Sequence, residues 1–112
     1  MTGMEFSNLV RHKFATVVIV LDNRGYGTER LLHPGDWKFN DIPAWQYHRL
    51  PEFCDGGNGY LIRTEGEFDV ALNAAWRERE QPSLLHVIID PQDCSRALGR
   101  LAERMSKTVV QK

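Results

Sequence analysis

The sequence predicts a three-layer α/β fold, in which helices cover both faces of a parallel sheet. Helical and strand-like segments alternate along the 112 residues, an order that is typical of parallel sheets. Two of the strand-like segments are continuous apolar runs, as expected of strands that are buried on both faces. The length, with 42% hydrophobic and 26% charged residues, fits one globular domain over residues 1–112.

The chain begins with a predicted helix and the strongest predicted strand. Residues 5–12 place Phe6, Leu9 and Val10 on one side of a helix that is already under way close to the first residue. Residues 14–21 are rich in β-branched side chains and predict a strand covered on both faces, and we expect its residues 16–21 at the centre of the sheet. Because the domain opens inside a helix, we expect that sequence is missing at its front.

A turn, a short helix and a long loop follow. Residues 22–27 predict the turn, and a short helix is expected from about Thr28. Residues 33–59 are rich in Pro, Gly, Trp and Asp and predict a loop with short helical turns. One such turn is expected at residues 50–53, because Pro51 suits a first helical position.

The second half of the chain predicts two further strands and two helices. Residues 59–63 predict a short strand, and Thr64 with Glu67 has the spacing of a capping box at the start of a helix. Residues 84–89 predict a buried strand, and residues 95–105 predict a last amphipathic helix. Because only three strands are predicted, we expect the sheet to be incomplete.

The bulk properties argue against several classes of function. A net charge of −1 gives no electrostatic basis for binding nucleic acid or an anionic membrane, and no apolar run reaches membrane-spanning length. Cys54 and Cys94 form neither a disulfide framework nor a CxxC metal pair, which favours a cytoplasmic protein with reduced thiols. The four histidines have no metal-ligand spacing and predict surface or packing roles.

The turn after the strongest strand is the candidate functional site. Ligands of parallel sheets bind beyond the carboxyl ends of the strands, where this turn is expected. The Asn23 side chain and a nearby backbone carbonyl offer oxygen ligands that suit Mg²⁺ bound to a diphosphate. The glycines Gly25 and Gly27 form no dinucleotide fingerprint, because its third glycine would fall at Arg30. An ordinary polar turn between a strand and a helix remains the alternative.

A family resemblance favours the first interpretation. Residues 17–23, Val-Val-Ile-Val-Leu-Asp-Asn, resemble the end of a motif shared by thiamine-diphosphate-dependent enzymes, which begins Gly-Asp-Gly and closes with Asn-Asn after a hydrophobic strand. Asp22 replaces the first Asn, a departure expected to matter little. Residues 1–12 resemble the helix between the two halves of that motif, so the Gly-Asp-Gly would lie before Met1. The resemblance implies an incomplete thiamine-diphosphate-binding (Rossmann-like) domain.

The continuation of the motif indicates a branch of that family. Residues 22–29, Asp-Asn-Arg-Gly-Tyr-Gly-Thr-Glu, resemble the Asn-Asn-x-Gly-Tyr-x-x-Glu of decarboxylases that act on pyruvate, indolepyruvate or phenylpyruvate. Residues 39–42 and Trp45 resemble the loop of the same enzymes. The resemblance implies thiamine diphosphate and Mg²⁺ as cofactors, a small 2-keto acid as substrate, and a homo-oligomer, dimer or tetramer, in the complete enzyme.

Residue roles can be carried over from this resemblance. The implied cofactor-binding residues are Asn23, Gly25, Tyr26, Gly27 and Thr28. Of these, the Asn23 side chain and the Gly25 carbonyl would bind Mg²⁺. Glu29 would be the catalytic carboxylate that handles protons, a task that suits a carboxyl group in a dry pocket. Thr28 stands where relatives often carry an aliphatic residue, which leaves the substrate preference open.

Two interpretations of the whole chain follow. The first is the C-terminal part of a thiamine-diphosphate-dependent carboxy-lyase, expected to be inactive as this fragment because the Gly-Asp-Gly and the domain that activates the cofactor are absent. The alternative is a non-catalytic α/β folding or interaction module, in which Glu29 is a solvent-facing residue at the start of a helix. We expect the aromatic residues Trp37, Trp45 and Tyr47 to pack the long loop onto the sheet, and the alternative is that they line a substrate pocket for an aromatic keto acid.

Overall fold

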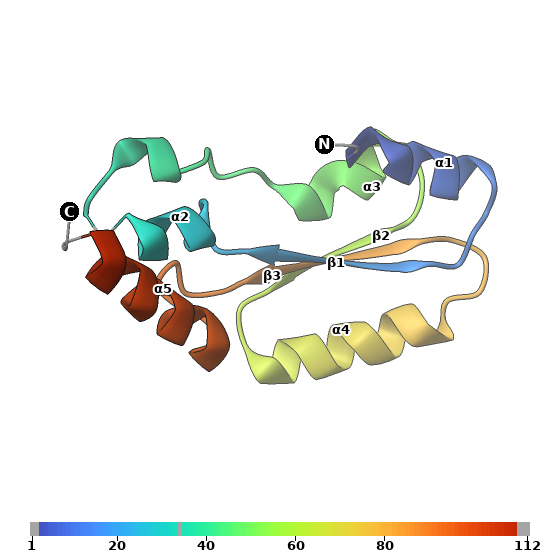
Figure 1. Ribbon diagram of the computed structural model, residues 1–112. Helices are drawn as coiled ribbons and strands as arrows, with labels where there is room; N and C mark the ends of the chain where they lie inside the picture. The colour runs from blue at the N-terminus through green and yellow to red at the C-terminus, as the bar shows by residue number, and fades with distance from the viewer. Residues whose placement is uncertain (1–2, 34, 110–112) are drawn as a thin grey trace. The chain divides into compact units, whose positions relative to one another are not determined.

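Three parallel strands form the sheet of this protein in a computed structural model, which describes residues 3–33 and 35–109 (Figure 1). The strands are β1 (Val17–Asp22), β2 (Asn58–Ile62) and β3 (Ser83–Ile88), and their order in the sheet is β1-β3-β2. Both pairs are parallel, as the alternation of helices and strands predicts. The predicted fold class is therefore confirmed.

β3 lies at the centre of the sheet, and the expectation that residues 16–21 would form the central strand is wrong. Leu85 of β3 pairs with Ile19 of β1 on one side and with Tyr60 of β2 on the other. Leu85 is fully buried, whereas Ile19 and Leu21 are 46% and 64% exposed. The described residues therefore do not cover β1 on both faces. A β-branched run shows that a strand favours burial, but it does not identify the neighbours that bury it.

Helices lie on both faces of this sheet and complete three layers. α4 (Glu65–Arg77) packs on β2 and β3, and α3 (Leu50–Phe53) contacts the same strands from the opposite face, next to α1 (Phe6–Arg11) (Figure 1). The buried core consists of Ile62, Ala71, Ala75 and Leu85. Full burial of a leucine such as Leu85 contributes roughly 1.5–3 kcal/mol. This core therefore joins the sheet to α4.

A turn before β1 makes the strand begin later than predicted. Lys13 has a positive φ of 53°, which ends the turn after α1. The Phe14 N–H donates to the Leu9 carbonyl at 3.0 Å, and the Thr16 N–H donates to the Phe14 carbonyl at 2.8 Å. These local hydrogen bonds occupy the residues before Val17, so they form a turn in place of the first residues of the predicted strand.

The predicted capping box at the start of α4 is confirmed. The Glu67 N–H donates to the Thr64 hydroxyl at 3.2 Å, and the Glu67 carboxylate accepts from the Thr64 N–H at 3.2 Å. The same carboxylate also accepts from the Arg63 N–H at 2.7 Å. Three donors at the helix start are thus satisfied locally, which is why the start of this helix is predictable from the sequence.

The chain divides into two compact units, which are described separately. Residues 1–22 and 45–88 form the first unit, which contains the sheet, and residues 23–44 and 89–112 form the second. The single domain expected over residues 1–112 stays a prediction. The loop prediction for residues 33–59 holds, because the residues that the structure describes between Leu32 and β2 form only short helical segments. These are η2 (Lys38–Asn40), η3 (Tyr47–Arg49) and α3.

The second unit contains the candidate turn and the two helices that accompany it. α2 (Gly27–Leu32) packs against α5 (Arg96–Val109), the predicted last helix. None of the helices in residues 3–33 and 35–109 combines the length and apolar character that a membrane span requires. Met1 and Thr2, the first residues of the segment that resembles the family's helix, lie outside the described residues.

Candidate functional site

A tight turn follows the last residue of β1, where the sequence places the candidate site. The Gly25 N–H donates to the Asn23 side-chain oxygen at 3.3 Å, across Arg24, whose φ is 58°. This left-handed conformation costs a non-glycine residue about 1–2 kcal/mol. Such a conformation persists only where the surrounding contacts hold it. The turn is therefore specified by its partners as well as by its own sequence.

A side chain at either glycine of the turn would displace neighbouring atoms. A Cβ atom added at Gly25 would overlap the Arg30 guanidinium and the Asn40 carbonyl. A Cβ atom at Gly27 would lie 2.7 Å from the Asn23 side-chain nitrogen. The sequence identifies these glycines as turn residues, and the structure shows which atoms fill the space that a side chain would take.

The segment around Asn40 holds the turn from a second direction. The Tyr26 N–H donates to the Asn40 carbonyl at 2.8 Å, and the Ile42 N–H donates to the Arg24 carbonyl at 3.2 Å. Asn40 is 1% exposed, and neither of its side-chain amide atoms has a hydrogen-bond partner among the described residues. Buried amides are normally satisfied by water, protein or ligand. Residues 39–42, selected by resemblance, thus contact the candidate turn.

Two oxygen atoms of the turn fit a divalent cation. The Asn23 side-chain oxygen accepts one long hydrogen bond, and the Gly25 carbonyl accepts none from the residues that the structure describes. Amide and carbonyl oxygens are the hard ligands that Mg²⁺ prefers, and Mg²⁺ keeps waters and substrate phosphates as its other ligands. The described residues contain no cluster of three or more His, Cys, Asp or Glu side chains that could bind a metal. The turn therefore fits a shared metal site better than a cage made by protein alone.

Glu29 lies on the first turn of α2 and is open to solvent. Its side chain is 50% exposed, and its Oε2 lies 3.4 Å from Nδ1 of His33. Thr28 is also exposed, and Tyr26 is 58% exposed. The dry pocket expected around the Glu29 carboxylate is not formed by the described residues. Chain order places all three residues directly after the turn, as the motif implies.

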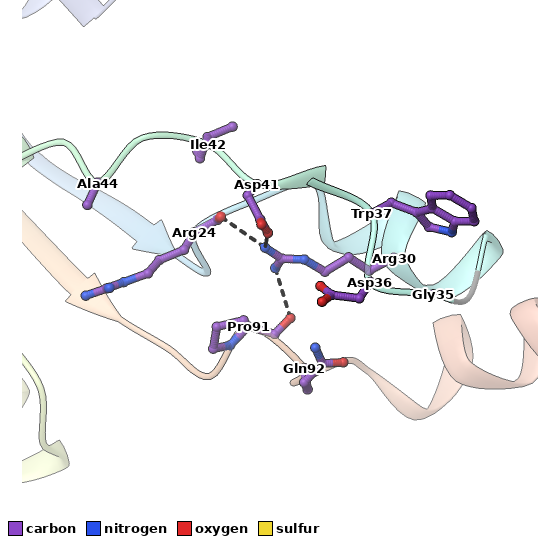
Figure 2. A pocket seen from close by; sticks show the side chains of 10 residues that line it. All are labelled: Arg24, Arg30, Gly35, Asp36, Trp37, Asp41, Ile42, Ala44, Pro91 and Gln92. Atoms are coloured by element: carbon purple, nitrogen blue, oxygen red, sulfur yellow. Dashed lines mark hydrogen bonds and ion pairs between the residues drawn. The ribbon is translucent and has the colours of Figure 1, made fainter. Parts of the chain in front are cut away.

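Arg30 organises the second unit, and sequence reasoning missed this role. Its side chain is 13% exposed and forms an ion pair of 2.8 Å with Asp41. It points toward the backbone of the turn, and a cavity of about 510 Å³ lies beside it (Figure 2). An arginine three residues after the last glycine of the turn is the only signal in the sequence, because the groups that it binds are mainly backbone carbonyls.

A buried hydrogen-bonded chain in the first unit was also missed. His86 Nε2 lies 2.8 Å from Asp22 Oδ2, and His86 Nδ1 lies 3.2 Å from His48 Nδ1. Burial lowers the pKa of His48 below its ordinary value, and electrostatic interactions with His86, Arg49 and Arg63 lower it further. Asp22 therefore has a buried structural partner, although its departure from the motif was expected to matter little.

Comparisons with known proteins give one family match and several relatives. Residues 1–87 match the family described as "Thiamine pyrophosphate enzyme, C-terminal TPP binding domain". A probable pyruvate decarboxylase of Schizosaccharomyces pombe is 32% identical over 105 residues, which cover 88% of this chain and 18% of the relative. An alpha-keto-acid decarboxylase of Mycobacterium tuberculosis is 31% identical over 108 residues, or 95% of this chain and 19% of the relative.

A third relative carries a different name. A 2-hydroxyacyl-CoA lyase of Oryza sativa is 38% identical over 99 residues, which cover 80% of this chain and 17% of the relative. The chain thus spans less than a fifth of the length of each of these relatives.

Proposed function

Because the chain belongs to the thiamine pyrophosphate enzymes, in their C-terminal TPP-binding domain family, we propose that it forms the cofactor-holding part of a 2-keto acid decarboxylase. One observation carries the proposal: the turn at Asn23–Gly25 offers two hard oxygen ligands and leads directly to the exposed carboxylate of Glu29. The names of the yeast and mycobacterial relatives support the same reaction class.

The residues of the turn would hold the cofactor with Mg²⁺. The Asn23 side chain and the Gly25 carbonyl would bind the metal, and Tyr26, Gly27 and Thr28 would lie along the diphosphate. When bound, thiamine diphosphate supplies the carbon nucleophile and the electron sink for loss of CO₂. The turn itself binds and orients the cofactor, because Gly25 leaves room for Arg30 and Asn40 to pack against the backbone that carries the ligand oxygens.

Glu29 would donate and accept the proton during the reaction. A carboxyl group performs this task near neutral pH when burial raises its pKa. The described residues leave the Glu29 side chain 50% exposed, so another domain or a second copy has to enclose it. A homo-oligomer, dimer or tetramer, is therefore part of the proposal. The proposal also includes a cytoplasmic location, which the two free cysteines support.

The test replaces the matching segment of the Schizosaccharomyces pombe relative with this chain. We expect the chimera to retain thiamine diphosphate and to release CO₂ from pyruvate, phenylpyruvate or indolepyruvate. In the chimera, Glu29→Gln should keep the cofactor but slow turnover at least about a hundredfold, because general acid–base catalysis contributes that much. The isolated chain should release no CO₂ above its own Glu29→Gln variant.

Two other results would favour other functions. A chimera that assembles like the unchanged relative but retains no thiamine diphosphate would favour the non-catalytic α/β module. A chimera that binds the cofactor and cleaves only a 2-hydroxyacyl-CoA would favour the activity named for the Oryza sativa relative.

A further inference from the structure

The guanidinium of Arg30 donates four hydrogen bonds within the second unit, and Figure 2 draws its partners Arg24, Asp41 and Pro91. Nη1 donates to the carbonyls of Asn23 at 2.9 Å and Pro91 at 3.2 Å. Nη2 donates to the carbonyl of Arg24 at 3.0 Å and to the Asp41 carboxylate at 2.8 Å. Two of these acceptors are consecutive carbonyls of the candidate metal turn.

These contacts leave one carbonyl of the turn available. Arg30 binds the carbonyls of Asn23 and Arg24, and the next carbonyl, of Gly25, accepts no hydrogen bond from the described residues. The Arg24 carbonyl is held twice, by Arg30 and by the Ile42 N–H. Both hydrogen bonds are accepted by Arg24, the residue with the positive φ, and they stabilise its strained backbone conformation.

The position of the guanidinium depends on Gly25 and Asp41. A Cβ atom at Gly25 would overlap the guanidinium, so the glycine lets Arg30 lie directly against the turn. The positive charge beside a candidate cation site would repel the cation. The Asp41 carboxylate, at 2.8 Å, offsets that charge.

We propose that Arg30 is a positioning residue for the divalent cation, an inference that rests on the proposed function of Asn23 and Gly25 as ligands. By fixing two carbonyls of the turn, Arg30 presets the two ligand oxygens in a geometry that suits Mg²⁺. Mg²⁺ requires nearly ideal octahedral geometry at about 2.0–2.1 Å, whereas Ca²⁺ accepts longer and less regular contacts. Loosening the turn therefore weakens Mg²⁺ binding more than Ca²⁺ binding.

The experiment compares Mg²⁺ and Ca²⁺ binding to the 112-residue chain with thiamine diphosphate present, followed by the amide NMR signals of Gly25 and Gly27. Arg30→Lys keeps the charge but loses the planar fork that reaches four acceptors. We expect it to weaken Mg²⁺ binding by about tenfold or more, as changes to residues that orient a metal ligand do. The loss of Ca²⁺ affinity should be clearly smaller.

Two further variants separate positioning from charge. Asp41→Asn leaves the three carbonyl contacts of Arg30 in place but removes the neutralising charge, so both cations should bind more weakly by the same factor. Arg49→Lys is the matched control, because it changes an exposed arginine that pairs with Glu52 in the first unit. It should change neither affinity.

The outcomes separate this inference from the proposed function. Unchanged Mg²⁺ binding in Arg30→Lys, or an equal loss of Mg²⁺ and Ca²⁺, overturns the role of Arg30 and leaves the metal assignment intact. If Arg30→Lys loses the amide spectrum of the folded chain, the binding measurements on Asp41→Asn test the proposal instead. A change in the ratio of Mg²⁺ to Ca²⁺ affinity in Asp41→Asn overturns it. No binding of either cation to the unchanged chain at millimolar concentration overturns both.

Discussion

Asp22 Oδ2 and His86 Nε2 lie 2.8 Å apart, and their side chains are only 6% and 4% exposed. Asp22 ends β1 and His86 lies in β3, so the contact joins two neighbouring strands. The Asp22 carboxylate accepts from Nε2–H of His86. A neutral His86 then has no hydrogen on Nδ1, so this atom must accept from Nδ1–H of His48 at 3.2 Å. The three side chains are thus satisfied together.

Replacing His86 should destabilise the sheet strongly. His86→Ala removes a hydrogen bond to a buried carboxylate and leaves a cavity in β3, which together cost about 3 kcal/mol in free energy of unfolding. Urea unfolding followed by circular dichroism measures the loss. Asp22→Asn is the control, because its amide oxygen still accepts from Nε2–H, and it should cost less than half as much. Equal losses in the two variants would contradict the assigned hydrogen bond.

His48 should make the stability of the chain depend on pH. Burial is the main cause that lowers its pKa from the ordinary value of 6.5, with contributions from His86, Arg49 and Arg63. At a pH between the lowered pKa of His48 in the folded chain and its ordinary pKa of 6.5 in the unfolded chain, His48 binds a proton only in the unfolded chain. The free energy of unfolding therefore falls as the pH drops below about 6.5.

Urea unfolding at several values between pH 7.5 and 5 checks this dependence. His48→Gln should make the free energy of unfolding less sensitive to pH in that range. His12→Gln, which removes an exposed histidine, is the matched control and should retain the slope. A slope that is identical in the unchanged chain and in His48→Gln would exclude His48 as its source.

Local features of this protein were predictable from the sequence, and contacts between distant segments were not. Thr64 and Glu67 form the predicted capping box because both partners lie within one helical turn. Arg30 and Pro91 are 61 residues apart, and Asp22 and His86 are 64 apart. No rule of sequence spacing predicts such partners. A backbone carbonyl can accept a hydrogen bond at any residue type, so the sequence does not identify the acceptors either. The candidate turn was identified through its resemblance to a family motif, because its glycine pattern alone also fits an ordinary turn.

The purified chain should self-associate. Among the described residues β1 pairs only with β3, and the neighbouring side chains Ile19 and Leu21 are 46% and 64% exposed. An unpaired strand edge with apolar side chains favours pairing with a second copy. Sedimentation at micromolar concentration should therefore show species larger than a monomer, and Leu21→Lys should shift them toward the monomer.

The matched control for self-association is Trp76→Lys, which removes a larger exposed apolar side chain from α4. It should leave the sedimentation profile unchanged. A monomer at every concentration, with cooperative unfolding, would show that the described residues bury enough of their own apolar surface.

Gly25→Ala should abolish cofactor binding at the turn, whereas Gly66→Ala should not affect it. A Cβ atom at Gly25 overlaps the Arg30 guanidinium and the Asn40 carbonyl, so the turn has to open and the ligand oxygens separate. A Cβ atom at Gly66 in α4 meets nothing within 4 Å, and alanine should raise the free energy of unfolding by about 0.5 kcal/mol.

Mg²⁺ titrations with thiamine diphosphate, followed by NMR, measure binding in both variants. Because opening of the turn breaks the hydrogen bonds of Tyr26 and Ile42, the amide signals of those residues should shift in Gly25→Ala alone. Binding that survives in Gly25→Ala would show that the cation does not depend on this turn.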